Sequence, residues 1–464
     1  MRNYDNRFNE RKTKLLEGSI WKGVVAFAIP LFLGNLFQQL YNIADSAIVG
    51  RFVGGESLYA ISASYSVTMI FLAVATGSSI GITVVAGKFF GAKKYIDLKT
   101  SINTAVIGIL VVSAVFALSG AFLSEPILKL LKTPADIMKE AKAYLQIFFY
   151  GLPFIYLYNA VSGAFAAIGD TKTTLYFLIF ASLLNIGLDL LAVIVLKMGV
   201  EGAAYATLIS QALSSIPAFF VLIKRLKGLN CEKAPLYSFA HQLTIIKIAV
   251  PSIIQHSIVS LGNLFIQERV NTFAAADISI GTAYSAAIKL NTFAINTFAA
   301  IGNATSSFTA QNLGGGEVGR VRSGYKAGVL SAVVMALPFT LCYVAMPSVC
   351  LKLFLDSSTT ENIQNVITYG KQFLYIVSPF YALIVVKIVT DGVLRGGERM
   401  AEFMASTFLD LMLRVSFAYV FTLGFGMDQT GIWWAWPVGW IISIIVSVAF
   451  YIRGKWKNIA MQKI

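Results

Sequence analysis

Charged residues are scarce in this chain of 464 residues, where Asp, Glu, Lys and Arg together make up 13% of the sequence. Soluble domains contain about 25% charged residues and about 45–50% apolar residues. Hydrophobic residues reach 57% in this chain. A soluble fold of this length could not bury so much apolar surface, so the composition excludes an ordinary soluble protein and predicts a membrane protein.

Several signatures of other functional classes are missing. The chain has three cysteines, an odd number, and Cys342 and Cys350 fall in one apolar run, which argues against a disulfide framework. The sequence contains no GxxxxGK[ST] phosphate loop, no HExxH motif and no cluster of metal ligands. We therefore expect a protein that is not an enzyme, has no cofactor and is not driven directly by ATP. The polar first 20 residues precede an apolar run too long for a signal-peptide core, so we expect no cleavage.

Apolar runs long enough to cross a membrane as helices recur about twelve times. They predict an all-α integral membrane protein with about 12 transmembrane helices. The short connections between the runs leave no room for a folded aqueous domain. The predicted spans are 21–50, 57–87, 100–123, 141–161, 173–197, 203–224, 244–271, 278–311, 325–350, 369–394, 403–425 and 430–452.

The sequence contains an internal repeat, in which the apolar runs and motifs of the first half recur in the second half. Pro30 aligns with Pro251, the Gly169–Asp170 pair aligns with Gly397–Glu398, and Asn185 aligns with Asp410, in the same order and at a nearly constant offset. Duplicated spans are typical of secondary transporters. We predict two pseudo-symmetric lobes of six helices each, residues 1–225 and 244–464, joined by a cytoplasmic linker at 226–243.

The chain has a net charge of +14, and the basic residues that produce it lie where they would flank membrane helices. With a cytoplasmic N-terminus, roughly 25 basic residues fall on the cytoplasmic side and roughly 8 on the other side. This bias predicts a multi-pass protein of the cell (inner) membrane with both termini in the cytoplasm. We expect contact with anionic membrane lipid rather than nucleic acid, and a monomer.

The first half carries two acids at membrane depth, and the bases of its predicted spans lie only at span ends. These acids are Asp45 and Asp189, with Asn185 one helical turn before Asp189 and Thr207 on the following span. A charge at this depth costs at least ~2.5–3.5 kcal/mol, so it needs a partner, a water-filled cavity or a function. Carboxylate, amide and hydroxyl oxygens suit Na⁺, and two crowded acids also raise each other's affinity for H⁺. The alternative is that Asn185, Asp189 and Thr207 only form hydrogen bonds between helices, with Asp45 at the outer interface.

The second half differs because its spans hold both signs of charge. Asp410 and Arg414 are four residues apart, the spacing of an ion pair on one helix face. Lys289 and Lys387 are the best candidates for unpaired bases facing a substrate, and such a base would favour zwitterions or anions over permanent cations. The charged residues of these spans include Glu268, Asp391, Asp410, Arg269, Lys289, Lys387 and Arg414.

Motifs along nearly the whole chain resemble the multidrug and toxic compound extrusion (MATE) family, most closely its DinF-type branch. They include the opening with Pro30, Gln39 and Asp45, the LLNIGLD segment, and GVEGAAYATLIS. The similarity resumes with P...Q at Pro251 and Gln255 and with DLMLRV at Asp410. The adjacent charges Glu268 and Arg269 depart from the pattern of the family.

This resemblance implies a Na⁺- or H⁺-driven exporter of small amphipathic organic substrates, with two six-helix lobes around a central cavity. It also implies that Asp45, Asn185, Asp189 and Thr207 form the cation site. The candidate residues of the substrate cavity are Gln39, Gln255, Glu268, Lys289, Lys387 and Asp410. Pro30 removes a backbone hydrogen bond and predicts a bend in the first span that alternating access could use.

Two other functions share part of this pattern. A flippase for a lipid-linked saccharide would also have duplicated helices, but phosphate recognition favours basic residues in its cavity, and the first half offers acids. A membrane-embedded enzyme would need a nucleophile or a metal constellation within the spans, and the predicted spans show no such constellation.

Overall fold

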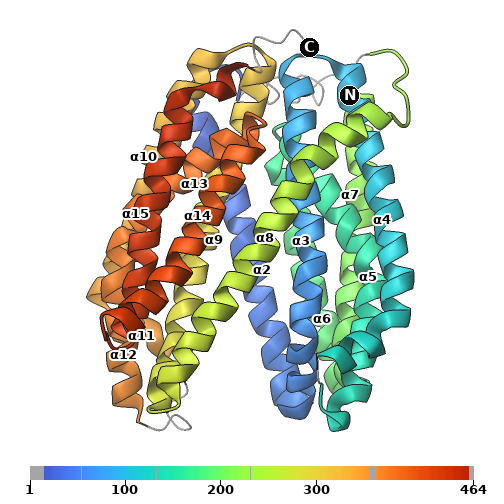
Figure 1. The fold of residues 1–464 in the computed structure, drawn as a ribbon. Helices are drawn as coiled ribbons and strands as arrows, with labels where there is room; N and C mark the ends of the chain where they lie inside the picture. Colours follow the sequence, from blue (N-terminus) through green and yellow to red (C-terminus); the bar gives the residue numbers. More distant parts are fainter. Residues whose placement is uncertain (1–14, 54, 132, 230, 356–361, 459–464) are drawn as a thin grey trace. The chain divides into compact units, whose positions relative to one another are not determined.

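Helices form all the regular structure in the part of the chain that the computed structural model describes, residues 15–53, 55–131, 133–229, 231–355 and 362–458 (Figure 1). The first half contains α2 (Ile20–Phe52), α3 (Gly55–Gly91), α4 (Tyr95–Leu130), α5 (Ala135–Ala167), α6 (Thr171–Asp189), the π-helix η1 (Leu190–Val195) and α7 (Gly199–Lys227). The second half contains α8 (Phe239–Ala274), α9 (Ile278–Gly314), α10 (Val318–Ala345), α11 (Pro347–Lys352), α12 (Ile363–Val377), η2 (Ser378–Phe380), α13 (Tyr381–Gly396), α14 (Met400–Tyr419), the π-helix η3 (Val420–Gly424), α15 (Thr430–Arg453) and η4 (Lys455–Lys457).

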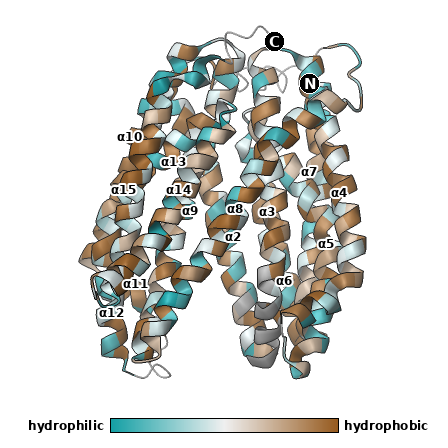
Figure 2. Cartoon of the chain, viewed as in Figure 1, coloured by the Kyte–Doolittle hydropathy of each residue, from teal (hydrophilic) through white to brown (hydrophobic). Residues whose placement is uncertain are grey.

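The predicted fold class is confirmed. Eleven helices of the described residues, counting α12 to α13 as one, are long and apolar enough to cross a membrane. The twelfth predicted span corresponds to α9, which has 37 residues but is rich in Asn, Ser and Thr. Most helices extend a few residues beyond the predicted apolar run, because a spanning helix can continue into the polar interface. Hydrophobic residues dominate the helices in Figure 2, and hydrophilic residues gather mainly near helix ends.

One predicted span is two helices. The run 325–350 is divided because α10 ends at Ala345 and α11 begins at Pro347. Proline is favoured in the first turn of a helix, where its missing N–H costs nothing. The prediction that Cys342 and Cys350 share one span was therefore wrong, and the break brings their sulfur atoms to 3.4 Å of each other.

The chain divides into two compact units. Unit 1 contains residues 29–253, and unit 2 contains residues 17–28 and 254–464. Both boundaries fall inside a helix, α2 or α8, within two or three residues of Pro30 or Pro251. A proline in a helix removes a backbone hydrogen bond and weakens the helix locally, so the two aligned prolines lie where each helix passes from one unit to the other.

In unit 1, α5 packs against α3, α4 and α7, and α6 packs against α7. Gly163 of α5 lies so close to α3 that a Cβ atom there would be 2.6 Å from the carbonyl oxygen of Ser79. The connection before α8 is attached to α4, because Lys99 Nζ donates to the Leu229 carbonyl at 2.9 Å and Thr104 Oγ1 accepts from the Ser238 N–H at 2.9 Å. The packing of α6 on α7 and of α7 on α5 positions the two helices that carry Asn185, Asp189 and Thr207 of the candidate site.

In unit 2, α9 packs against α10, α12 and α13, while α15 packs against α13 and α14. Tyr284 of α9 and Trp433 of α15 stack with their rings 5.4 Å apart and nearly parallel. Phe373 of α12 meets Trp433 edge to face at 5.3 Å. Aromatic contacts of this geometry favour close packing beyond the area that they bury, and they form much of the core where α9, α12 and α15 meet.

Candidate functional site

The candidate cation site lies in unit 1, where α2, α6 and α7 each supply part of it. Asp189 is the last residue of α6, and the π-helix η1 begins at the next residue. Asn185 is one turn earlier, and both side chains are buried, with exposed fractions of 1% for Asn185 and 0% for Asp189. π-Helical turns are frequent at functional sites, and this one directly follows a buried acid.

The structure brings the four predicted residues together. Asn185 Nδ2 donates to Thr207 Oγ1 at 3.3 Å, which joins α6 to α7. The carboxyl groups of Asp45 and Asp189 lie close enough to form a hydrogen bond, provided that one of them carries a proton. The grouping predicted from the sequence is therefore present in the fold, while its role in binding a cation stays a prediction.

When both acids are ionised, four oxygen atoms of this group lack a hydrogen-bond donor from the described residues. They are Asp45 Oδ1, Asn185 Oδ1 and both carboxyl oxygens of Asp189. Burying a carboxylate without a partner is costly, so such a group takes up a proton or binds a cation. Carboxylate and carbonyl oxygens are the ligands that hard cations prefer. The donor set therefore fits either H⁺ or Na⁺.

Two tyrosines belong to the group and were missed by the sequence analysis. The Tyr41 hydroxyl is within hydrogen-bonding reach of Thr207 and near the charges of Asp45 and Asp189. Tyr144 of α5 lies near Tyr41 and the same two acids. Tyr41 precedes Asp45 by four residues, so helical spacing could have indicated it. Nothing in the sequence distinguished Tyr144 from an ordinary core residue.

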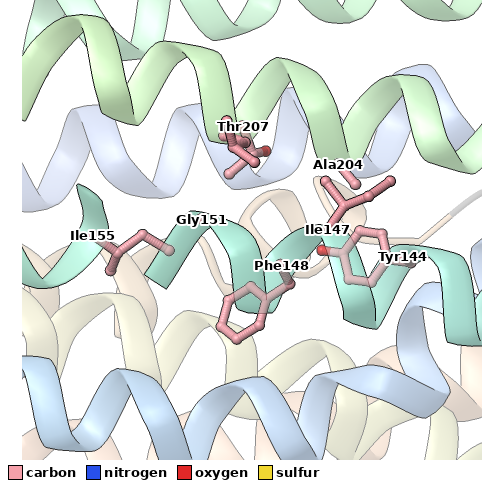
Figure 3. Close-up of a pocket in the computed structure, with 8 residues that line it drawn as sticks. Tyr144, Ile147, Phe148, Gly151, Ile155, Ala204 and Thr207 are labelled. Carbon is pink, nitrogen blue, oxygen red and sulfur yellow. The ribbon is translucent and has the colours of Figure 1, made fainter. Parts of the chain in front are cut away.

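A pocket adjoins this group in unit 1 (Figure 3). Only Tyr144 and Thr207 bring side-chain hydroxyl groups to it, and the other side chains are apolar. Thr207 therefore belongs both to the candidate cation site and to the pocket wall. The lining residues are Tyr144, Ile147, Phe148, Gly151 and Ile155 of α5 with Ala204, Thr207 and Leu208 of α7.

The prediction that Lys387 is an unpaired base was wrong. Its Nζ atom lies 2.6 Å from Asp391 Oδ2 on the same helix, and Ser447 Oγ of α15 donates to Asp391 Oδ1 at 2.7 Å. Both charged side chains are buried, with exposed fractions of 6% and 8%. The spacing of four residues in α13 allowed this pair, but the sequence analysis assigned that role to Asp410 and Arg414.

The remaining candidates of the substrate cavity are spread over several helices. Lys289 is exposed on α9, with Nζ 5.8 Å from the centre of the Phe354 ring. Glu268 of α8 is also exposed and accepts a hydrogen bond from the Tyr419 hydroxyl. Gln39 of α2 is half-buried in unit 1, and Gln255 of α8 is half-buried in unit 2.

Asp410 and Arg414 do not form the predicted ion pair. Asp410 is half-buried, and its Oδ1 atom accepts a hydrogen bond from Ser443 Oγ of α15 at 3.4 Å. The Arg414 guanidinium instead lies over the Trp436 ring, 4.1 Å from its centre. Helical spacing permits an ion pair, but packing against α15 decides which way each side chain points.

The sequence model of the MatE family matches residues 30–191 and 251–420 of the chain. The two matched segments begin at Pro30 and Pro251, the aligned prolines of the internal repeat.

Similar proteins cover from about three quarters to almost all of the chain. The probable multidrug resistance protein YpnP of Bacillus subtilis strain 168 is 28% identical over 95% of this chain and 97% of its own length. The FAD transporter of Shewanella oneidensis MR-1 is 23% identical over 73% of this chain and 74% of its own length. A solved structure of a multidrug resistance MATE family transporter of the MOP superfamily, in an outward-facing conformation, has the same fold, with a TM-score of 0.89 and 21% identity over 97% of this chain and 99% of its own.

Proposed function

Since the chain belongs to the MatE family, we propose that this multi-pass membrane protein is a secondary multidrug exporter that removes small amphipathic organic compounds and is driven by Na⁺ or H⁺. The similar proteins named as probable multidrug resistance proteins support the export of drug-like compounds. The relative named as an FAD transporter indicates that cargo varies among related chains, so the cargo of this chain depends on its own residues.

The observation that carries this proposal is the set of four buried oxygen atoms without donors around Asp45 and Asp189. If these residues served only to form hydrogen bonds between helices, their oxygen atoms would be paired with donors and two ionisable groups would not be needed. A coupling site must bind its cation and release it in each cycle, so its oxygens are left available.

In the proposed mechanism, a cation arriving from outside neutralises Asp45 and Asp189 and changes the conformation of α2. The part of α2 that responds is the turn at Pro30, because proline removes a backbone hydrogen bond there and weakens the helix. Asn185 and Thr207 hold the oxygen ligands of α6 and α7 at a fixed spacing. Alternating access follows when this change exposes bound substrate to the other side of the membrane.

The charge of the cargo decides how much drive the membrane potential supplies. One elementary charge that crosses 100 mV is worth about 2.3 kcal/mol. Exchanging one inward Na⁺ for one outward monovalent cation gains nothing from the potential and relies on the ion gradient alone. A neutral or zwitterionic substrate keeps the contribution of the potential.

The proposed location is the cell membrane, with both termini in the cytoplasm and the transporter acting as a monomer. The excess of basic residues in the connections assigned to the cytoplasm supports this orientation.

The test is transport in proteoliposomes under separate Na⁺ and H⁺ gradients. We expect one of the two gradients to drive export of a fluorescent amphipathic compound, and we expect Asp189→Asn and Asp45→Asn to abolish the driven component. The matched control is Asp136→Asn, which changes an exposed acid in the first turn of α5. Gradient-driven export at the wild-type rate by both site variants would refute coupling at this site.

A further inference from the structure

The break between α10 and α11 brings three sulfur-containing residues together in unit 2. Cys342 lies in the last turn of α10, Met346 joins the two helices, and Cys350 lies in α11. The Met346 N–H donates to the Cys342 carbonyl at 2.9 Å, and the Cys350 N–H donates to the Met346 carbonyl at 3.2 Å. These bonds have the spacing of an α-helix, so the three residues follow one another at about one per turn along the α10–α11 corner, residues 342–350.

The two cysteine side chains meet at this corner. Their sulfur atoms are 3.4 Å apart, and both residues are free thiols. Cys350 is buried, with an exposed fraction of 5%, and Cys342 is half-buried. Met346 has an exposed fraction of 52%, and its flexible thioether can turn toward the thiols. The α10–α11 corner therefore offers two adjacent thiols with a flexible third sulfur beside them.

Packing against neighbouring helices holds the α10–α11 corner in this shape. On the α10 side, the Tyr343 hydroxyl donates to the Leu290 carbonyl of α9 at 2.9 Å. On the α11 side, Leu351 is fully buried against α12, where a Cβ atom at Gly370 would lie 2.7 Å from Leu351 Cδ1. Each cysteine is the immediate neighbour of one of these anchoring residues, so the two thiols are positioned before any ligand binds.

The sulfur ligands determine which metal ion suits the corner. Thiolate and thioether sulfurs favour soft ions such as Cu⁺ over hard ions such as Na⁺ or Mg²⁺. A structural Zn²⁺ site needs four ligands, and the described residues contain no group of three or more His, Cys, Asp or Glu side chains that could hold a metal. Two sulfurs that bind one ion at about 2.3 Å are about 3.8–4.0 Å apart at tetrahedral to trigonal angles. The two thiols therefore need to separate by only about half an ångström.

We propose that Cys342, Met346 and Cys350 form a three-sulfur site for a soft monovalent metal ion of the class of Cu⁺ and Ag⁺. Each thiol that binds the ion releases its proton to water, and no electron is transferred. The bound ion joins the end of α10 to α11, which packs on α9 and α12. In the proposed orientation, α10 carries the ninth span and ends outside the cell, so the site faces external metal. The metal site itself does not depend on the proposed export function.

The experiment measures Ag⁺ retained by the purified, reduced protein in detergent. Ag⁺ shares the preference of Cu⁺ for sulfur and, unlike Cu⁺, is stable in air. A monothiol is added in excess as a competitor, because a single cysteine then loses its ion while ligands joined in one site keep it. We expect wild type to retain one Ag⁺ per chain, which an excess of Zn²⁺ does not displace. Bound Ag⁺ should also raise the midpoint temperature of thermal unfolding, since an ion that binds only the folded protein stabilises it.

Matched variants test each ligand. Cys342→Ser and Cys350→Ser should each weaken Ag⁺ binding at least about 100-fold, the lower end of the gain from joining ligands in one site, and abolish retention. Cys231→Ser is their control, because it removes the cysteine in the connection between α7 and α8, and it should leave retention unchanged. Met346→Leu keeps the size of the side chain without its sulfur and should weaken binding about tenfold. Its control is Met412→Leu, which changes an exposed methionine of α14 and should have no effect.

A reversible modification separates metal binding from folding. A diazenedicarboxamide, which accepts two electrons and two protons, joins the thiols of Cys342 and Cys350 as a disulfide, and this should abolish Ag⁺ retention. Reduction should restore retention in the same sample, so the question is decided even where a serine variant does not fold. Absence of retained Ag⁺ in reduced wild type, or retention at the wild-type level by both serine variants, overturns the proposal. An unchanged affinity in Met346→Leu would contradict the three-sulfur arrangement.

Discussion

At the scale of single residues, the chemistry of the chain is concentrated in a few buried polar groups. Asp189 is fully buried beside a second acid and lacks a donor for either oxygen. Asn185 and Thr207 differ from the acids, because they form a hydrogen bond with each other and offer only neutral oxygen atoms to a cation. Charged ligands dominate the attraction for a cation, and neutral ligands mainly set its distance and number of contacts. Removing an acid and removing a neutral ligand should therefore have different consequences.

We predict that Asn185→Ala and Thr207→Ala weaken coupling without abolishing it. Each removes one neutral oxygen and leaves both acids in place, and loss of a supporting group at an ion site typically reduces affinity about 10- to 100-fold. The measurement is the ion concentration that gives half-maximal export in proteoliposomes. Loss of all driven export in Thr207→Ala would contradict the distinction between charged and neutral ligands.

We also predict that Cys342 and Cys350 form a disulfide under mild oxidation. Their sulfur atoms are 3.4 Å apart, so a small side-chain movement suffices. The oxidant, a diazenedicarboxamide, accepts the two electrons and two protons released when the thiols join. Thiol titration of the unfolded protein should fall from three reactive cysteines to one, since the chain has three. Cys342→Ser is the control, and it should keep both remaining thiols after oxidation.

At the scale of elements, helix ends and breaks decide which side chains meet. α6 and α14 both end in a π-helical turn, η1 after Asp189 and η3 after Tyr419. The same kind of turn therefore recurs near the end of the corresponding helix in each half, although the residues before it differ. Within α13, which has no such break, regular helical spacing places Lys387 next to Asp391. The two side chains pair with each other, so neither is left for substrate recognition.

We predict that the Lys387–Asp391 pair is structural. Lys387→Met leaves the buried Asp391 carboxylate with Ser447 as its hydrogen-bond partner among the described residues, and breaking a buried pair costs about 3–5 kcal/mol. The double variant Lys387→Met with Asp391→Leu removes both charges and should recover most of that stability. Thermal unfolding in detergent measures the effect, with Lys326→Met as the control for an exposed lysine. A double variant no more stable than Lys387→Met would contradict this interpretation.

At the scale of the whole molecule, the charge distribution is the feature that sets orientation. The connection between α7 and α8 contains exposed Lys233, and Glu125 lies near the opposite end of α4 from its first turn at Tyr95. Basic residues near spans are retained on the cytoplasmic side. The direction of transport depends on this orientation, because the same site would import its cargo if the protein were inverted.

We predict that a single cysteine at Glu125, in a background without the native cysteines, reacts with an impermeant thiol reagent added to intact cells. One at Lys233 should react only after the membrane is permeabilised. The measurement is the labelled fraction before and after permeabilisation, with the cysteine-free protein as the blank. Labelling of Lys233→Cys in intact cells would invert the proposed topology.

The sequence by itself determined the class of this protein, its twelve apolar segments, the repeat and the four residues of the candidate cation site. These features follow from local composition and helical spacing, since long apolar runs and buried acids are costly anywhere but in a membrane helix with a role for the acid. Tertiary structure decided which charges are paired. Arg414 and Lys387 have equivalent spacing to an acid in the sequence, yet α15 supplies an aromatic ring to Arg414 and a hydroxyl to the acid that pairs with Lys387. It also brought Tyr144 to the acids and divided the predicted span 325–350. Contacts between helices far apart in the chain leave no periodic signal in either helix, and for that reason the partner of each buried charge could not be read from the sequence.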